Sequence, residues 1–171
     1  MAISIALISD THSYIDEGII AHLNEADEVW HAGDIGAIDV VNRFPKGKVV
    51  RVVTGNIDDS EMRQRFPEEL SFDVEGLRVL MVHIGGNPGR YARGIKSRIQ
   101  ESGATLFVCG HSHLCRVEHD RQLNCLYMNP GAAGIQGFHK MRTLLKFKVA
   151  GGKISDLVVV ELGKRGMPGQ N

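Results

Sequence analysis

The chain of 171 residues lacks several features that would place it in a specialised class of protein. No apolar run approaches the roughly 18 residues of a membrane-spanning helix, and Met1 is followed by an apolar segment without a charged leader, so neither a membrane span nor export is expected. Twenty basic and twenty acidic residues leave no formal net charge. This balance argues against a general affinity for nucleic-acid backbones or anionic membrane surfaces.

Cysteine is scarce, and its spacing carries no metal or disulfide signal. Cys109, Cys115 and Cys125 are odd in number and form no C-x-x-C pair, so neither a disulfide framework nor a cysteine zinc site is expected. A reducing compartment fits this pattern best, and a cytoplasmic location is predicted. The sequence also has no G-x-G-x-x-G or Walker lysine motif. Most aromatic residues of strand-like runs are expected in the core, which leaves no evident base-stacking platform.

The composition is that of an ordinary globular domain, with 43% hydrophobic and 23% charged residues. The length favours one domain over residues 1–171, with a loose tail from residue 163 onward. Short runs rich in Val, Ile and Leu are typical of buried strands, and they occupy residues 3–8, 28–30, 49–54, 77–82 and 106–109.

Helical patterns alternate with these strands in the first two-thirds of the chain. They occupy residues 15–26, 36–44, 60–66 and 90–102, with Gly103 as the expected cap of the last. Strands alone follow, at residues 115–119, 124–128, 143–149 and 153–161, with Gly151-Gly152 as a hairpin signal. This order predicts an α/β fold in which two sheets pack face to face and helices cover the outer faces.

Short polar clusters follow the five early strands. They are Asp10-Thr11-His12, Gly33-Asp34, Gly55-Asn56-Ile57-Asp58, His83 and Gly110-His111-Ser112-His113. Ligands of layered α/β folds gather beyond the carboxyl ends of strands, so these clusters can converge although they are distant in sequence. Their oxygen and imidazole side chains are suited to a centre with two metal ions.

Each cluster alone has a plainer interpretation. Asp10 and His12 are two residues apart and can reach one ion, but Asp10 could instead cap a turn or helix. The two oxygens of Asp34 could bridge two cations, or the residue could begin the next helix. Asn56 offers a neutral amide oxygen, although Asn is commoner in turns.

The histidines are equally ambiguous when each is taken alone. His111 and His113 could bind neighbouring ions or be surface residues, and His83 could be a hydrogen-bonded rim residue. His31 could orient a ligand or serve the core, and we assign no role to His22, His119 or His139. One centre explains all five clusters together, and the joint pattern therefore favours a two-metal site.

In their order along the chain, these motifs resemble the calcineurin-like metallophosphoesterase superfamily, especially its small bacterial and archaeal phosphodiesterase branch. The motifs are D-x-H, G-D, G-N-x-D, H and G-H-x-H. The turn Asn129-Pro130-Gly131-Ala132 resembles the N-P-G-S turn of that branch, and the resemblance covers residues 3–133. It implies a four-layer α/β/β/α sandwich with two mixed sheets.

The resemblance also implies a ligand set and a reaction. Asp10, His12, Asp34 and His113 would hold one divalent ion, and Asp34, Asn56, His83 and His111 would hold the other. A hydroxide bridging the two ions would attack phosphorus in a small phosphoester substrate, with Asp34, Asn56 and His83 at the catalytic centre. Mn²⁺ is the first choice by resemblance, and the mixed donors also suit Fe, Zn²⁺, Ni²⁺ or Mg²⁺.

Two positions depart from the family pattern. Many superfamily phosphatases have a histidine, a candidate general acid, where this chain has Ile57, which cannot transfer a proton. This difference predicts a preference for diesters with good leaving groups. The segment Ile84-Gly85-Gly86 replaces the usual Gly-x-His-like continuation and alters the substrate-facing loop.

Two alternatives to a phosphodiesterase remain open. A non-catalytic scaffold can share this fold, as in the retromer subunit that resembles these enzymes, and a metal sensor or store would bind ions without turnover. A scaffold has no chemical need for seven correctly typed ligands. No motif specifies the oligomeric state, and a homodimer is the working hypothesis.

Overall fold

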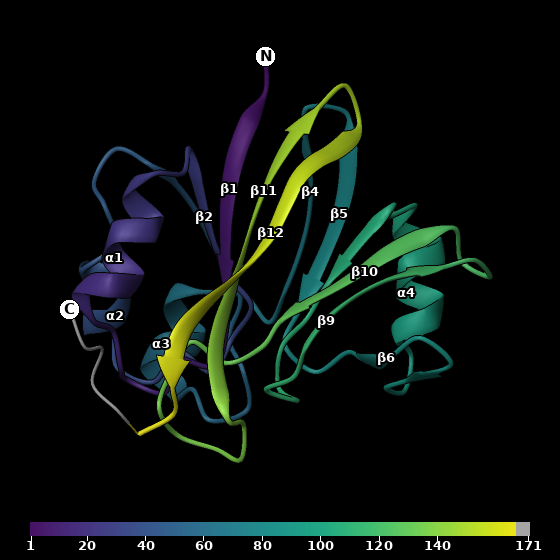
Figure 1. Ribbon diagram of the computed structural model, residues 1–171. Helices are drawn as coiled ribbons and strands as arrows, with labels where there is room; N and C mark the ends of the chain where they lie inside the picture. The colour runs from purple at the N-terminus through teal and green to yellow at the C-terminus, as the bar shows by residue number, and fades with distance from the viewer. Residues whose placement is uncertain (167–171) are drawn as a thin grey trace.

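A computed structural model describes residues 1–166, in which ten strands form two mixed five-stranded sheets (Figure 1). The first sheet has the order β12 (Lys153–Lys164), β11 (Met141–Ala150), β1 (Ile3–Ile8), β2 (Glu28–His31), β3 (Val49–Val52). The second has the order β4 (Glu69–Val74), β5 (Leu77–Val82), β8 (Leu106–Val108), β10 (Cys125–Pro130), β9 (Cys115–Asp120). Helices cover the outer faces, so the predicted four-layer sandwich is confirmed.

The main core lies between the two sheets. Trp30 of β2 is fully buried there and packs edge-to-face on Phe72 of the opposite sheet, with ring centroids 5.0 Å apart. Phe147 of β11 contacts the same indole ring at 5.6 Å. Aromatic pairs of this geometry add to the stability gained from apolar burial, and they hold the sheets face to face.

Two smaller apolar layers attach the helices. α1 (Glu17–Asn24), α2 (Asp39–Asn42) and α3 (Ser60–Arg65) pack on the first sheet, and α4 (Ile95–Ser102) packs on the second. Ile19 and Leu23, four residues apart, are the buried positions of α1. The helix is capped by Asp16, whose carboxylate accepts the Ile19 N–H at 2.8 Å.

Parallel pairing places the carboxyl ends of the strands that precede the polar clusters at one edge of the sandwich. β1, β2 and β3 are parallel and in register, so that Ile8 lies beside His31 and His31 beside Val52. In the second sheet β5 and β8 are also parallel. The loops that follow these five strands therefore emerge together, which is the condition for a shared site.

Several predicted helix bounds need correction. The helices expected over residues 15–26, 36–44 and 60–66 are shorter, at Glu17–Asn24, Asp39–Asn42 and Ser60–Arg65. The helix expected over residues 90–102 begins only at Ile95, because Gly94 adopts a left-handed φ of 81° that interrupts the helical backbone. The preceding residues instead form a small hairpin of β6 (Gly86–Asn87) and β7 (Arg90–Tyr91).

The strand β4 was not predicted. It is the edge strand of the second sheet and pairs antiparallel with β5. Glu69, Ser71 and Asp73 alternate with apolar residues, so half of the strand is polar and only Val74 is buried. A half-solvated edge strand gives a weaker apolar signal than the buried strands.

The C-terminal hairpin matches the prediction, but the predicted tail does not. Gly151 and Gly152 join β11 to β12 with φ values of 54° and 72°. β12 continues to Lys164, where Gly163 pairs with Arg142, so the loose tail does not begin at residue 163. The rest of that predicted tail, residues 167–171, lies outside the described residues. Within residues 1–166 no helix is long and apolar enough to cross a membrane.

Candidate metal centre

The predicted ligand residues converge at the shared strand edge. Asp10 and His12 follow β1, Asp34 follows β2, Asn56 follows β3, His83 follows β5, and His111 and His113 follow β8. Six of them form two groups in which the candidate ligand atoms lie within 4.8 Å of one another. The groups are Asp10 with His12 and His113, and Asp34 with His83 and His111.

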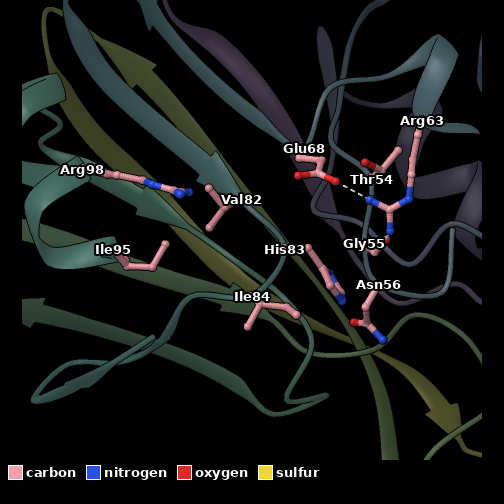
Figure 2. A pocket seen from close by; sticks show the side chains of 10 residues that line it. All are labelled: Thr54, Gly55, Asn56, Arg63, Glu68, Val82, His83, Ile84, Ile95 and Arg98. Carbon is pink, nitrogen blue, oxygen red and sulfur yellow. Dashed lines mark hydrogen bonds and ion pairs between the residues drawn. The ribbon is translucent and has the colours of Figure 1, made fainter. Parts of the chain in front are cut away.

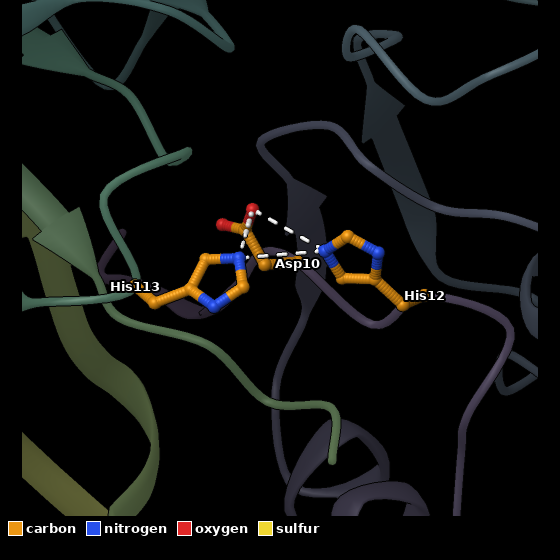
Figure 3. Close-up of side chains that lie close together, drawn as sticks. All are labelled: Asp10, His12 and His113. Atoms are coloured by element: carbon orange, nitrogen blue, oxygen red, sulfur yellow. Dashed lines mark hydrogen bonds and ion pairs between the residues drawn. The ribbon is translucent and has the colours of Figure 1, made fainter. Parts of the chain in front are cut away.

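The first group surrounds one oxygen of a buried carboxylate. Figure 3 shows His12 and His113 on either side of Asp10, with both rings turned toward it. Asp10 Oδ1 lies 3.1 Å from His113 Nε2 and 3.9 Å from His12 Nε2. Its other oxygen accepts hydrogen bonds from the Ser9 hydroxyl at 2.6 Å and the His111 backbone N–H at 3.1 Å. The carboxylate is thereby fixed so that Oδ1 faces the two imidazoles.

Asp34 connects the two groups. Its Oδ1 lies 3.1 Å from Nε2 of His83, and its Oδ2 lies 3.6 Å from Nε2 of His12. The Ile57 backbone N–H donates to Oδ1 at 3.1 Å and fixes the rotation of the carboxylate. One oxygen of Asp34 thus faces each histidine group, which is the arrangement that a bridging ligand requires.

Asn56 and His111 form the exposed side of the cluster. Asn56 lines one hollow together with His83 and a second hollow together with Asp34 and His111. His111 contacts His83 edge-to-face, with centroids 5.3 Å apart. The cluster is therefore buried on the sheet side and open to solvent on the side where a substrate would arrive.

The donor atoms fit bound cations. Among the described residues, three buried side-chain atoms have no hydrogen-bond partner; two of them, Asp10 Oδ1 and His83 Nε2, point into the cluster, and the third is Nδ1 of His22 in α1. The Nδ1–H of His83 donates to the Ala32 carbonyl at 2.7 Å, so Nε2 is the nitrogen available to a metal. Buried polar atoms without partners are costly, and coordination of a cation would satisfy both.

The electrostatics of the cluster depend on close pairs of opposite charge. Burial alone would favour neutral Asp34, but contact with His83 and the Ile57 N–H outweighs it and lowers the pKa of the carboxyl group. Burial likewise opposes a charge on His83, yet Asp34 and Asp10 raise its pKa. A dication between these residues would take the place of the histidine proton.

The backbone at the site adopts conformations that L-residues rarely take. Nine non-glycine residues among those described have a positive φ, and five of them are predicted ligands. These five are Asp10 (54°), His12 (46°), Asp34 (54°), His111 (68°) and His113 (59°). Strain of this kind clusters at functional sites, where the surrounding structure enforces it. At Gly55, a Cβ atom would lie 2.1 Å from Asp34 Oδ1, so only glycine permits this approach.

Three residues that support the ligand loops were not identified from the sequence. Asp58 accepts the backbone N–H groups of Gly36 at 2.8 Å and Gly55 at 2.7 Å, which joins two of the loops. Asn129 donates to the Gly110 carbonyl at 2.8 Å. His139 contacts His113, with Nδ1 atoms 3.2 Å apart. Asp58 belonged to a recognised cluster and Asn129 to the family-like turn, whereas no local signal marks His139.

His31 is fully buried and hydrogen-bonded, which the sequence left open. It contacts the Thr11 hydroxyl at 2.9 Å and accepts the Gly33 N–H on Nδ1 at 3.2 Å. Burial lowers its pKa to about 3, so the ring is neutral. His31 therefore links the Thr11 side chain of one ligand loop to the Gly33 backbone of the next and touches no ligand side chain in these contacts.

The comparison with known families agrees with this geometry. Residues 3–152 match the calcineurin-like phosphoesterase superfamily domain. The chain belongs to the calcineurin-like phosphoesterase superfamily, whose members are metallophosphoesterases, and its two histidine and carboxylate groups are the expected metal-binding feature.

The chain is similar to a sequence relative and to two solved structures. A probable metallophosphoesterase of Methanothermobacter thermautotrophicus is 26% identical over 133 residues, which cover 75% of this chain and 76% of the relative. The phosphoesterase YfcE of E. coli has a TM-score of 0.63 at 18% identity, covering 91% of this chain and 98% of its own. Vps29 of Entamoeba histolytica, solved as a Zn²⁺ complex, has a TM-score of 0.65 at 15% identity, covering 93% and 99%. The two structural likenesses show a shared fold alone.

Proposed function

We propose that the protein is a metal-dependent phosphodiesterase with a dinuclear centre. The observation that carries the proposal is the placement of Asp34, which turns one carboxylate oxygen toward His83 and the other toward His12. In this assignment Asp10, His12, Asp34 and His113 would hold one ion, and Asp34, Asn56, His83 and His111 would hold the other. The residue groups around Asp10 and Asp34 support this division.

The two cations would supply a nucleophilic hydroxide and neutralise charge on the phosphoryl oxygens. Hydrogen bonds within the protein hold the metal-ligand side chains in position. Asp10 is fixed by Ser9 and the His111 backbone, and His83 by the Ala32 carbonyl. Asn56 adds a neutral oxygen donor on the exposed side, which avoids a third carboxylate where the anionic substrate must approach. Mn²⁺ remains the first choice among the metals that suit oxygen and imidazole donors.

Ile57 supports a preference for diesters. It is 45% exposed and lines the same hollow as His111 and His113, at the position where many superfamily phosphatases carry a histidine. An aliphatic side chain cannot protonate a leaving oxygen. A diester with a good leaving group needs less protonation than an alkyl monoester, and it also carries one negative charge fewer.

The alternative function is a non-catalytic interaction scaffold. The structural likeness to Vps29 supports it, because the fold is shared with a protein named for vacuolar sorting. Against it stand the two buried unpartnered atoms of Asp10 and His83, which a scaffold without metal would leave unsatisfied.

The deciding experiment removes all metal with a chelator and reloads the protein separately with Mn²⁺, Zn²⁺, Ni²⁺ and Mg²⁺. Hydrolysis of matched diesters and monoesters is measured beside the metal content. We expect diester turnover with two ions bound. A His111→Gln variant should lose this activity, whereas the matched variant of the exposed β9 residue, His119→Gln, should retain it. Two bound ions without turnover of any ester would instead favour the scaffold or a metal sensor.

A further inference from the structure

Two hollows of different character meet at the metal centre. The first has a volume of about 250 Å³, and Figure 2 shows its lining, with Asn56 and His83 beside Arg63 and Glu68, and Arg98 on the far side. The second has a volume of about 480 Å³ and lies over Asp34, His111 and His113. Asn56 lines both hollows. A phosphodiester has two substituents that diverge from one phosphorus, and two hollows that diverge from one centre match this shape.

The second hollow has an apolar wall made of three exposed side chains. Phe138 is 102% exposed, Leu114 is 65% exposed and Ile57 is 45% exposed, and all three line this hollow. A fully exposed phenylalanine gains nothing from folding, and several large apolar side chains around one concave site indicate a binding surface.

The wall is fixed relative to the candidate ligands. Ile57 follows Asn56 directly, and its backbone N–H donates to Asp34 Oδ1 at 3.1 Å. Leu114 follows His113, and Phe138 precedes His139, which contacts His113 through the two Nδ1 atoms at 3.2 Å. A substituent that contacts these three side chains would therefore lie next to the metal centre.

The first hollow has a mixed lining, because Val82, Ile84 and Ile95 lie beside charged side chains. Arg63 donates to the carbonyls of Asp58 at 3.0 Å and Gly55 at 2.9 Å, and it pairs with Glu68. Arg98 pairs with Glu69 at 3.1 Å. Both ion pairs are solvent-exposed, and pairs of this kind contribute little energy, so they do not select the charge of a substituent in this hollow.

We infer that the substrates are phosphodiesters in which an aromatic substituent packs against Phe138, Leu114 and Ile57, while the other substituent enters the hollow of Figure 2. This inference rests on the proposed function. Phe138 selects the substrate by contact with its aromatic substituent, whereas the metal ligands position the ions that bind the phosphoryl group. Phosphonates with one substituent separate these contributions, because they bind without being hydrolysed.

The test is calorimetric binding of phenylphosphonate and methylphosphonate to the full-length protein reloaded with Mn²⁺. We expect the phenyl compound to bind about tenfold more tightly, because roughly 50 Å² of additional apolar surface would be buried. Phe138→Ala should reduce this ratio at least about threefold, and Phe138→Tyr should preserve it because the ring remains. The control Val158→Ala removes another exposed apolar side chain, from β12 at 53% exposure, and should leave the ratio unchanged.

Equal affinities for the two phosphonates would overturn the aromatic assignment while leaving the metal centre intact. A ratio that survives Phe138→Ala would overturn the role of the wall. Failure of both phosphonates to bind the protein with two ions present would overturn the proposed function itself, and this inference with it. The three results are distinct, so failure of the substrate class cannot be mistaken for failure of the centre.

Discussion

The Nδ1 atom of His139 lies 3.2 Å from the Nδ1 atom of His113, and this contact fixes the tautomers of both rings. His139 Nε2 lies 3.0 Å from the Gly134 carbonyl, which can only accept a hydrogen bond, so Nε2 carries the proton. Burial lowers the pKa of His139 and keeps it neutral. Its Nδ1 then accepts from the Nδ1–H of His113, so Nε2 of His113, which lies 3.1 Å from Asp10 Oδ1, is the nitrogen available to a metal.

This relationship predicts a measurable tautomer and a metal affinity. In the protein loaded with diamagnetic Zn²⁺, ¹⁵N NMR should show a proton on Nδ1 of His113 and on Nε2 of His139. His139→Phe keeps an aromatic ring but removes the acceptor, and it should weaken metal binding about tenfold in a chelator competition assay. His22→Phe, which changes a histidine of α1 away from the centre, is the control. A proton on Nε2 of His113, or unchanged affinity in His139→Phe, would contradict the assignment.

Asp34→Asn tests the bridging position. The amide keeps the shape of the side chain but has one oxygen and no charge, so it can coordinate only one of the two ions, and that ion more weakly than a carboxylate does. We expect the metal content to fall from two ions to one or none and diester turnover to fall at least about a hundredfold. Metal analysis by mass spectrometry beside the kinetics measures both. Asp39→Asn, an exposed change in α2, is the matched control. Full activity with two ions bound would reject the bridge.

The two-sheet fold and the convergence of the seven residues could be predicted because their signals are local. A short apolar run identifies a buried strand, and a polar cluster such as Asp10-Thr11-His12 directly after it is placed at a strand end. Parallel pairing then brings these ends to one edge. None of these steps requires knowledge of contacts between distant residues.

The features that the sequence did not predict depend on contacts between residues that are distant in the chain. His139 was assigned no role because its partner His113 is 26 residues away and no spacing relates them. Phe138 was overlooked because it lies outside the strand-like runs, whose aromatic residues were expected in the core; that expectation is correct for Trp30 and Phe107. The helix start at residue 90 was wrong because the periodic pattern extends through Gly94, whose left-handed conformation is set by the adjoining hairpin.

Ile57→His should change the preference between esters. The isoleucine side chain lines the hollow over the centre, and its contact with Asp34 is made by the backbone, which the substitution retains. A histidine there could protonate the leaving oxygen, and general acid catalysis contributes about a hundredfold or more in favourable cases. We expect the ratio of monoester to diester kcat/KM to rise at least about tenfold. Ile57→Val supplies the control without a titratable group. An unchanged ratio in Ile57→His would show that leaving-group protonation does not limit the reaction.

Asp16 and Arg142 form an ion pair that should make the free energy of unfolding decrease at acid pH. Arg142 has a fully buried side chain, and its guanidinium donates to Asp16 at 2.9 Å and to the Ala133 carbonyl at 2.8 Å. Burial alone would raise the pKa of Asp16, but the Ile19 N–H and Arg142 outweigh this effect, and the net pKa is lowered. A carboxyl group with a lowered pKa in the folded state contributes stability above its unfolded pKa near 3.8 and loses it as the pH falls further.

Asp16→Asn preserves an oxygen for the helix cap but leaves the Arg142 charge buried without its partner. We expect the free energy of unfolding at pH 7 to fall by about 2 kcal/mol, less than for a fully buried pair because Asp16 is 23% exposed. The deficit relative to the wild type should shrink at pH 3, because this pH lies below the unfolded pKa of Asp16 near 3.8 and the contribution of the charge declines there. Urea unfolding at both pH values measures this. The surface pair of Lys148 and Asp156 supplies the control, since Asp156→Asn should leave the free energy of unfolding nearly unchanged at both pH values. A deficit in Asp16→Asn that is equal at the two pH values would show that the charge of Asp16 does not stabilise the fold.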